Sequence, residues 1–129
     1  MNSARRPRQL LIMDTCVLID FLDADPSVLP LITKHIGQVY AIREIIVEVG
    51  SLKDEEQFRK LGIAIIETER EDIAKAVSIH GGLSFPDKLC LLTAKRHGFT
   101  CVTNDKKLRA TCKLEAVPII WGILLLGFL

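Results

Sequence analysis

Four acidic residues stand beside apolar segments, at points where strands or helices are expected to begin or end. Asp14 follows an apolar run at residues 10–13, and Glu48 lies late in an apolar stretch. Asp87 comes directly after Ser-Phe-Pro, and Asp105 closes a second short apolar run. A carboxylate at the edge of an apolar core costs free energy unless a partner or a cation neutralises it. Carboxylates that converge would favour a hard divalent cation such as Mg²⁺ or Mn²⁺, which prefers oxygen ligands.

The segments around these acids alternate between strand-like and helix-like patterns. Short apolar runs predict strands at 9–13, 39–42, 63–67, 100–103 and 117–120. Amphipathic stretches between them predict helices at 15–22, 27–35, 45–49, 54–61, 69–78, 84–97 and 106–113. Thr68 and Glu71 predict a capping box at the start of one helix, and Gly81-Gly82 predicts a turn. Ser84 and Gly98 predict the two ends of another helix.

This alternation predicts an α/β fold with three layers, in which helices cover both faces of a central, mostly parallel sheet of four or five short strands. Ligands of such folds bind beyond the carboxyl ends of the strands. Asp14 and Asp105 are expected at those ends. Glu48 and Asp87 are expected in the first two turns of helices that border the same crevice, so the fold permits all four acids to converge.

Length and charge set modest bounds. At 129 residues the chain is one domain, with a flexible basic arm expected at 1–8 and the folded part at 9–129. The net charge of +1 gives no overall field that would attract nucleic acid. Between Lys95 and Lys113, however, six basic residues accompany the single acid Asp105. Such a flank beside an acidic pocket would suit a phosphodiester substrate, and a merely solvated helix face is the alternative.

The cysteines indicate a reducing compartment. There are four, without a Cys-x-x-Cys pair and without a secretory signal, so we expect a cytoplasmic protein. The three histidines have no metal-ligand spacing with these cysteines, which argues against a structural zinc site.

Four motifs resemble those of PIN-domain nucleases, in the same order and at similar spacing from about residue 10 to residue 120. They are Asp14-Thr15-Cys16-Val17-Leu18-Ile19-Asp20, Ile45-Ile46-Val47-Glu48-Val49, Leu83-Ser84-Phe85-Pro86-Asp87 with Ala94-Lys95-Arg96-His97-Gly98, and Thr103-Asn104-Asp105-Lys106-Lys107-Leu108-Arg109. The chain looks most like small single-domain toxin ribonucleases of the VapC type. One departure is Cys16, where many members have Asn or Ser.

The resemblance implies a three-layer fold and Mg²⁺- or Mn²⁺-dependent cleavage of RNA. It implies metal-binding and catalytic roles for Asp14, Glu48, Asp87 and Asp105. Thr103 is expected to position a carboxylate or a water molecule on the metal. The basic residues Lys106, Lys107 and Arg109 are expected to bind the RNA. Many similar proteins are toxins of toxin–antitoxin pairs, so an antitoxin protein is a candidate partner.

Other interpretations of these residues stay open. Asp14 and Asp105 would serve as helix caps, and Asp87 would favour a helix dipole wherever it pointed. Glu44 lies one turn before Glu48 on the same helix face and competes with it for the site. A phosphoaspartate nucleophile at Asp14 would require a second Asp two positions later, where the chain has Cys16. A non-catalytic PIN fold that binds RNA or acts as a scaffold is the alternative function.

The last thirteen residues, 117–129, carry no charge. This segment is too short to span a bilayer, which needs about 20 apolar residues, so no membrane association is expected. A helix that is apolar nearly all round must be buried. Burial against the chain's own domain is one possibility, and burial against a partner is the other. We expect a homodimer with residues 121–129 at or near the contact.

Overall fold

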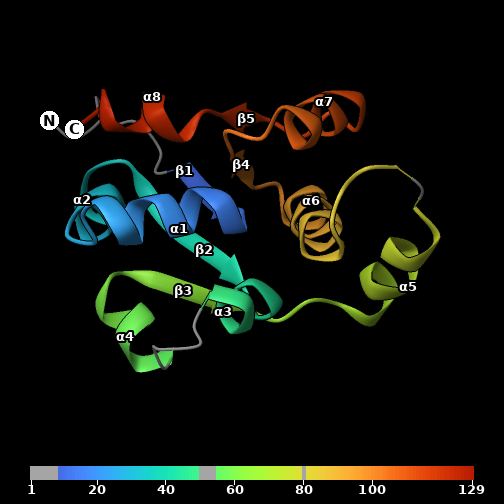
Figure 1. Ribbon diagram of the computed structural model, residues 1–129, viewed down its shortest axis with the longest axis horizontal. Coiled ribbons are helices and arrows are strands. Elements are labelled where there is room, and N and C mark those ends of the chain that lie inside the picture. The colour runs from blue at the N-terminus through green and yellow to red at the C-terminus, as the bar shows by residue number, and fades with distance from the viewer. Residues whose placement is uncertain (1–8, 50–54, 80) are drawn as a thin grey trace, which may run out of the picture.

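A computed structural model describes residues 9–49, 55–79 and 81–129, and at its centre is a five-stranded sheet (Figure 1). Its strands are β1 (Gln9–Met13), β2 (Gly37–Ile42), β3 (Ile63–Ile66), β4 (Thr100–Val102) and β5 (Ile119–Ile120). All neighbours pair in parallel, in the order β3-β2-β1-β4-β5. The predicted strands are therefore confirmed, with bounds that differ by one or two residues.

Helices connect the strands and cover both faces of the sheet. They are α1 (Thr15–Ala24), α2 (Val28–His35), α3 (Arg43–Val49), α4 (Glu55–Lys60), α5 (Arg70–Ser78), α6 (Phe85–His97), α7 (Lys106–Leu114) and the terminal α8 (Gly122–Leu126). Parallel crossovers are right-handed, which puts α1 to α4 on one face and α5 to α7 on the other. The contacts of α1 with α3, and of α6 with α5 and α7, agree with this division. The predicted three-layer α/β/α fold is confirmed.

The strand order reverses at the centre of the sheet. From β1 the chain moves outward to β2 and β3, then returns through α5 and α6 to β4 on the other side of β1. In the register of these two strands, Met13 lies opposite Val102. Helices leave this point toward opposite faces, which is where folds of this kind bind ligands beyond the carboxyl ends of their strands. We call the region beyond the ends of β1 and β4 the crevice. The next residues of the chain at these ends include Asp14 and Thr103.

Caps fix the ends of α6 as predicted. Ser84 accepts a hydrogen bond from the Asp87 amide, and Gly98 ends the helix with φ of 74°. The predicted capping box of α5 is wrong. Glu69 occupies the cap position without a side-chain hydrogen bond. The Thr68 hydroxyl donates instead to a Glu44 carboxylate oxygen at 2.7 Å, and a hydrogen bond to a charged acceptor is stronger than one to a neutral group.

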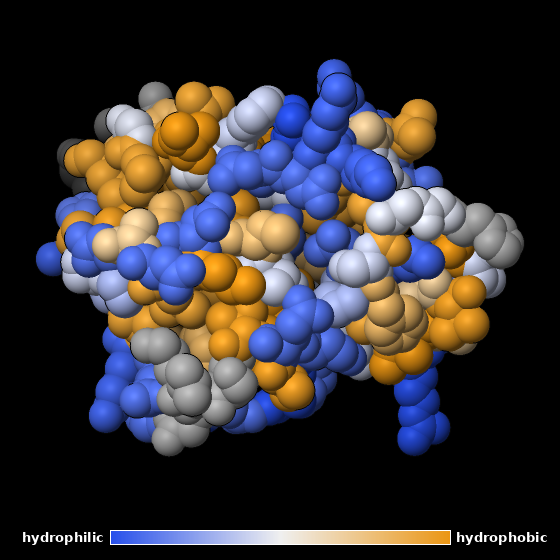
Figure 2. Space-filling view, viewed as in Figure 1, coloured by the Kyte–Doolittle hydropathy of each residue, from blue (hydrophilic) through white to orange (hydrophobic). Residues whose placement is uncertain are grey.

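The terminal helix α8 is only partly buried. Leu125 is fully buried, whereas Ile123 is 66% exposed and Phe128 beyond the helix is 61% exposed. Apolar atoms gather over α8 at the upper left of Figure 2. Burial against its own domain therefore does not account for this segment. Among the described residues, no helix has the length and apolar character needed to cross a bilayer.

Two expectations fall outside the described residues. The basic arm at 1–8 is one, and Asp54 as the start of a helix is the other. All four cysteines are unpaired thiols, with Cys16 exposed and the other three in the core.

Candidate active site

Asp14 is the most buried acid of the crevice, with 1% of its surface exposed. It caps α1 by accepting the Val17 amide at 2.8 Å through Oδ1, and its Oδ2 accepts the hydroxyl of Thr103. Burial raises the pKa of Asp14, these two hydrogen bonds lower it, and the charges of Asp105 and Asp20 raise it again. The capping role and the site role therefore coexist in one side chain.

Thr103 links the ends of β1 and β4. Its side chain is fully buried, and its hydroxyl donates to Asp14 while accepting the Asp105 amide at 3.0 Å. Asp105 in turn caps α7 by accepting the Lys107 amide at 2.8 Å. One hydroxyl thus fixes the position of one carboxylate and the backbone of the next. A role of Thr103 in positioning a water molecule on a metal stays a prediction.

Asp87 faces the same crevice from the first turn of α6. Its pKa is raised to about 6, first by burial and then by the charge of Asp14. The hydrogen bond to Ser84 lowers this pKa, while Asp105 and Glu48 raise it further. The three carboxylates that act on Asp87 are the other three acids predicted from the sequence. Repulsion by these three charges adds to the effect of burial on the pKa of Asp87.

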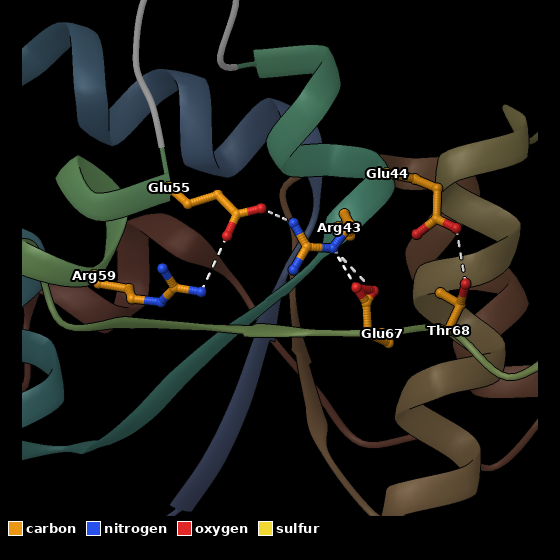
Figure 3. Close-up of polar contacts among 6 residues, drawn as sticks. All are labelled: Arg43, Glu44, Glu55, Arg59, Glu67 and Thr68. Carbon is orange, nitrogen blue, oxygen red and sulfur yellow. Dashed lines mark hydrogen bonds and ion pairs between the residues drawn. The ribbon is translucent and has the colours of Figure 1, made fainter.

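Glu48 and Glu44 differ although both lie on α3. Glu48 is exposed, and its charge acts on Asp87. Glu44 turns toward Thr68 and binds its hydroxyl, as Figure 3 shows. The other oxygen of Glu44, Oε1, is buried and has no hydrogen-bond partner among the described residues. Of the two glutamates, Glu48 is the one whose charge helps to raise the pKa of Asp87.

The predicted basic residues lie at the start of α7, beside Asp105. Lys106 and Lys107 are exposed. The Lys107 side chain packs over Gly82 in the loop before α6. A Cβ added at Gly82 would lie 3.0 Å from the Nζ atom of Lys107. The Arg109 guanidinium lies over the Trp121 ring, 3.6 Å from its centroid. This contact ties α7 to the segment that leads into α8.

Two contributors were not predicted from the sequence. The exposed thiol of Cys16 lies at the rim, where its pKa is raised by burial and then by Asp14, Asp87 and Asp105. Asn104 accepts the Gly122 amide at 2.9 Å and so holds the start of α8 against the crevice loop. Asn104 lies in the fourth motif of the sequence, but this motif gave no sign of the hydrogen bond to Gly122. Its partner lies 18 residues away in the chain.

The donor set suits a hard divalent cation. Every acid of the crevice offers carboxylate oxygens, the ligands that Mg²⁺ and Mn²⁺ prefer, and their repulsion would be relieved by positive charge. In the part of the chain that the structure describes, no three Asp, Glu, His or Cys side chains form a group that could hold an ion as they lie. The fit therefore rests on the chemistry and electrostatics of the donors.

Solved structures share this fold. A PilT N-terminus domain protein from Sulfolobus solfataricus is 14% identical, with a TM-score of 0.61 and coverage of 91% of this chain and 90% of that chain. A toxin–antitoxin complex from Klebsiella pneumoniae is 21% identical, with a TM-score of 0.62 and coverage of 87% and 97%. FitAcB from Neisseria gonorrhoeae is 17% identical, with a TM-score of 0.59 and coverage of 88% and 99%.

No curated protein matches the sequence. The sequence profile described as "PIN domain" does match, over residues 11–114, which include Asp14, Glu48, Asp87 and Asp105. This match covers most of the chain, and the shared fold agrees with it. The chain belongs to the PIN domain family.

Proposed function

We propose that this chain is a divalent-metal-dependent endoribonuclease that cleaves phosphodiester bonds of RNA. The observation that carries the proposal is the buried Asp14 carboxylate at the end of β1, which the Thr103 hydroxyl links to the backbone of Asp105 at the end of β4. Mutually repelling carboxylates at the reversal point of a parallel sheet weaken the fold unless a ligand uses them. Membership of the PIN domain family supports a nuclease.

Each residue of the crevice has a defined part in this proposal. The acids that would hold Mg²⁺ or Mn²⁺ are Asp14, Glu48, Asp87 and Asp105. An ion bound there would polarise the scissile phosphate and lower the pKa of the attacking water. The Val17 amide and the Thr103 hydroxyl hold the Asp14 carboxylate in one orientation, so its oxygens need little reorganisation when the substrate arrives.

The start of α7 supplies the positive charge for the substrate. Lys106 and Lys107 stand next to Asp105, and Arg109 follows on the same helix. Cations at this edge attract the RNA backbone toward a crevice that would otherwise repel it. The Lys107 side chain passes close to Gly82, so its charge lies near the start of α6, the helix whose first turn holds Asp87.

Replacing Asp14 tests the proposal. Asp14→Asn should lower the cleavage rate by at least about a hundredfold in Mg²⁺ or Mn²⁺, because it removes a ligand charge. The fold should persist, since Asn is also a good N-cap. The measurement is cleavage of single-stranded RNA across a titration of each ion.

The matched control is Asp23→Asn, the same change at an exposed position of the same helix, which should leave the rate unchanged. An Asp14→Asn variant as fast as the wild type would remove Asp14 from the site. Wild-type protein that binds RNA but cleaves none with either ion would favour the alternative, a non-catalytic RNA-binding or scaffold protein.

We extend the proposal to partners. One of the similar structures is a toxin–antitoxin complex, and we infer that this chain acts as the toxin of such a pair, with an antitoxin protein as its partner. We also infer a homodimer, because the end of the chain leaves large apolar side chains in water, and a small domain rarely exposes so many together.

Light scattering tests the homodimer. Leu124 on α8 is 58% exposed, so Leu124→Glu should leave the fold intact and halve the molar mass by placing a charge in the contact. Val77→Glu is the matched control, because Val77 is also an exposed apolar residue of a helix, 73% exposed on α5. A monomeric wild type at high micromolar concentration would sink the inference.

A further inference from the structure

A hollow lies between helices α5, α6 and α7, away from the acidic crevice. It measures about 270 Å³ and is bordered by the last turn of α5, the middle of α6 and the second half of α7. Leu91 and Leu92 are buried beneath it and Ile79 is half-buried, so its floor is apolar. Lys75 and Lys95 stand at its rim with the acid Glu115.

Of the two lysines at the rim, only Lys95 forms an ion pair with a described residue. Lys95 pairs with Glu115 at 2.8 Å, and this pair is neutral overall. Lys75 has no hydrogen bond or ion pair through its ammonium group among the residues that the structure describes. The hollow therefore combines an apolar floor with one unpaired cation, which favours a ligand with an apolar part and an anionic part.

The wall of the hollow is anchored. The Lys88 ammonium donates to the Ile79 carbonyl oxygen at 2.8 Å, which holds the end of α5 against α6. The hydroxyls of Ser78 and Thr111, which also border the hollow, donate to the carbonyl oxygens of Lys75 and Lys107. With their protons used in this way, both hydroxyls can still accept a hydrogen bond from a ligand.

The hollow and the crevice share two helices. α6 begins beside Asp87 and α7 begins after Asp105, and both run from the crevice toward the hollow. Leu91 and Lys95 follow Asp87 by four and eight residues, so they lie about 6 Å and 12 Å farther along the α6 axis. Residues at this spacing stay on neighbouring parts of one helix surface. An RNA strand bound in the crevice can thus reach the hollow along α6.

We propose that this hollow is a subsite for one nucleotide of the RNA strand, next to the nucleotides at the scissile bond. The inference rests on the proposed ribonuclease function and deepens it. The base would contact the apolar floor at Ile79 and Leu92, and the phosphate would face Lys75. The volume lies just below the usual range of ligand pockets, which suits one nucleotide. A second contact on a strand already held at the crevice strengthens binding through effective concentration.

Binding to the cleavage-deficient Asp14→Asn protein tests the subsite without turnover. In that background Lys75→Ala should weaken binding of a long single-stranded RNA about fivefold and reduce its salt slope by about 0.7, the share of one phosphate contact. Lys34→Ala is the matched control, because Lys34 is an exposed lysine on α2, on the other face of the sheet. Equal effects of the two variants would overturn the subsite.

Amide chemical shifts give a second readout. Adenosine monophosphate should shift the Ser78 and Thr111 amides of the Asp14→Asn protein, and Lys75→Ala should remove these shifts. The same shifts with inorganic phosphate alone would overturn the base contact. A Lys75→Ala variant that lost affinity for a protein partner but not for RNA would make the hollow a peptide site and overturn the proposal.

Cleavage by the otherwise unchanged protein separates this inference from the proposed function. Lys75→Ala should slow cleavage of a long RNA and leave cleavage of a dinucleotide, which is too short to reach the hollow, unchanged. Equal slowing of both substrates would overturn the subsite. If the wild type cleaved neither substrate, the proposed function would fail, and the binding and chemical-shift measurements would still decide whether the hollow takes a nucleotide.

Discussion

Two aspartates of this chain are almost completely buried, in opposite surroundings. Asp72 on α5 is 3% exposed and is held by the guanidinium of Arg96, with nitrogen–oxygen distances of 2.8 and 3.0 Å. Asp14 is 1% exposed, and its hydrogen-bond donors are a neutral amide and a neutral hydroxyl. The charges that act most on Asp14 are carboxylates, Asp105 and Asp20. The fold neutralises one buried acid and leaves the other uncompensated.

This difference separates a structural acid from a functional one. The Asp72–Arg96 pair fastens α5 to α6, and Arg43 likewise joins α3 to Glu67 after β3 and to Glu55 of α4 (Figure 3). In such pairs, the negative charge is balanced by a cation of the same chain. A buried carboxylate that contacts only neutral donors and other carboxylates has its charge balanced only when a cation binds from outside. Burial alone does not distinguish the two cases, whereas the sign of the neighbouring charges does.

Removing the partner of the structural acid should have the largest effect on stability. Arg96→Leu leaves the Asp72 carboxylate buried without a cation, and an uncompensated carboxylate of this burial costs about 3 kcal/mol of unfolding free energy. Denaturant unfolding measures the loss. Cleavage by the folded variant should match the wild type, because neither residue belongs to the crevice.

The double variant Arg96→Leu with Asp72→Asn is the control. Removing the stranded charge should restore part of the lost stability. If Arg96→Leu alone cost no stability, Asp72 would be as uncompensated as Asp14 and the contrast between the two acids would disappear.

Removing an acid from the crevice should have the opposite sign. The pKa of Asp87 is about 6 in the fold, above its ordinary value of 3.8. The fold therefore disfavours the charged form, and the unfolding free energy falls as the pH rises from 3.8 through 6. In metal-free buffer near pH 7, Asp87→Asn should stabilise the protein by about 1 kcal/mol once solvent screening is allowed for.

The same variant supplies its own control. Near pH 4 the wild-type carboxyl is largely protonated, so the difference in unfolding free energy should vanish. Added Mg²⁺ should stabilise the wild type more than the variant. A gap that did not depend on pH would mean that the fold does not raise the pKa of Asp87.

The contrast between the two acids could be predicted from the sequence only in part. Asp14 and Asp105 follow apolar runs, so their place at the strand ends was visible, and the layered fold followed from the alternation of segments. Asp72 lies in the charged run Glu69-Arg70-Glu71-Asp72 and reads as solvated. Its partner is 24 residues away and meets it only because α5 packs on α6.

Other side-chain contacts were not predicted for the same reason, because their partners are distant in sequence. Thr68 was expected to cap its own helix, but its hydroxyl reaches a carboxylate 24 residues earlier in the chain. Arg109 rests on Trp121, and Lys107 crosses Gly82. Local patterns predict elements and their ends, while side-chain partners distant in sequence depend on how the elements pack.

The two glutamates of α3 give the comparison with the smallest expected change in stability. Glu48 is exposed, so Glu48→Gln should alter the unfolding free energy by less than about 0.5 kcal/mol. Its charge raises the pKa of Asp87, so the variant should move the acid limb of the pH–rate profile to lower pH and slow cleavage at least about tenfold. Glu44→Gln changes the acid that binds Thr68 and should leave that limb in place. The opposite result would be a shift of the acid limb by Glu44→Gln and none by Glu48→Gln. Glu44 would then be the glutamate that acts on Asp87. A hydrogen bond within the chain, such as that of Glu44 with Thr68, would no longer identify an acid as structural.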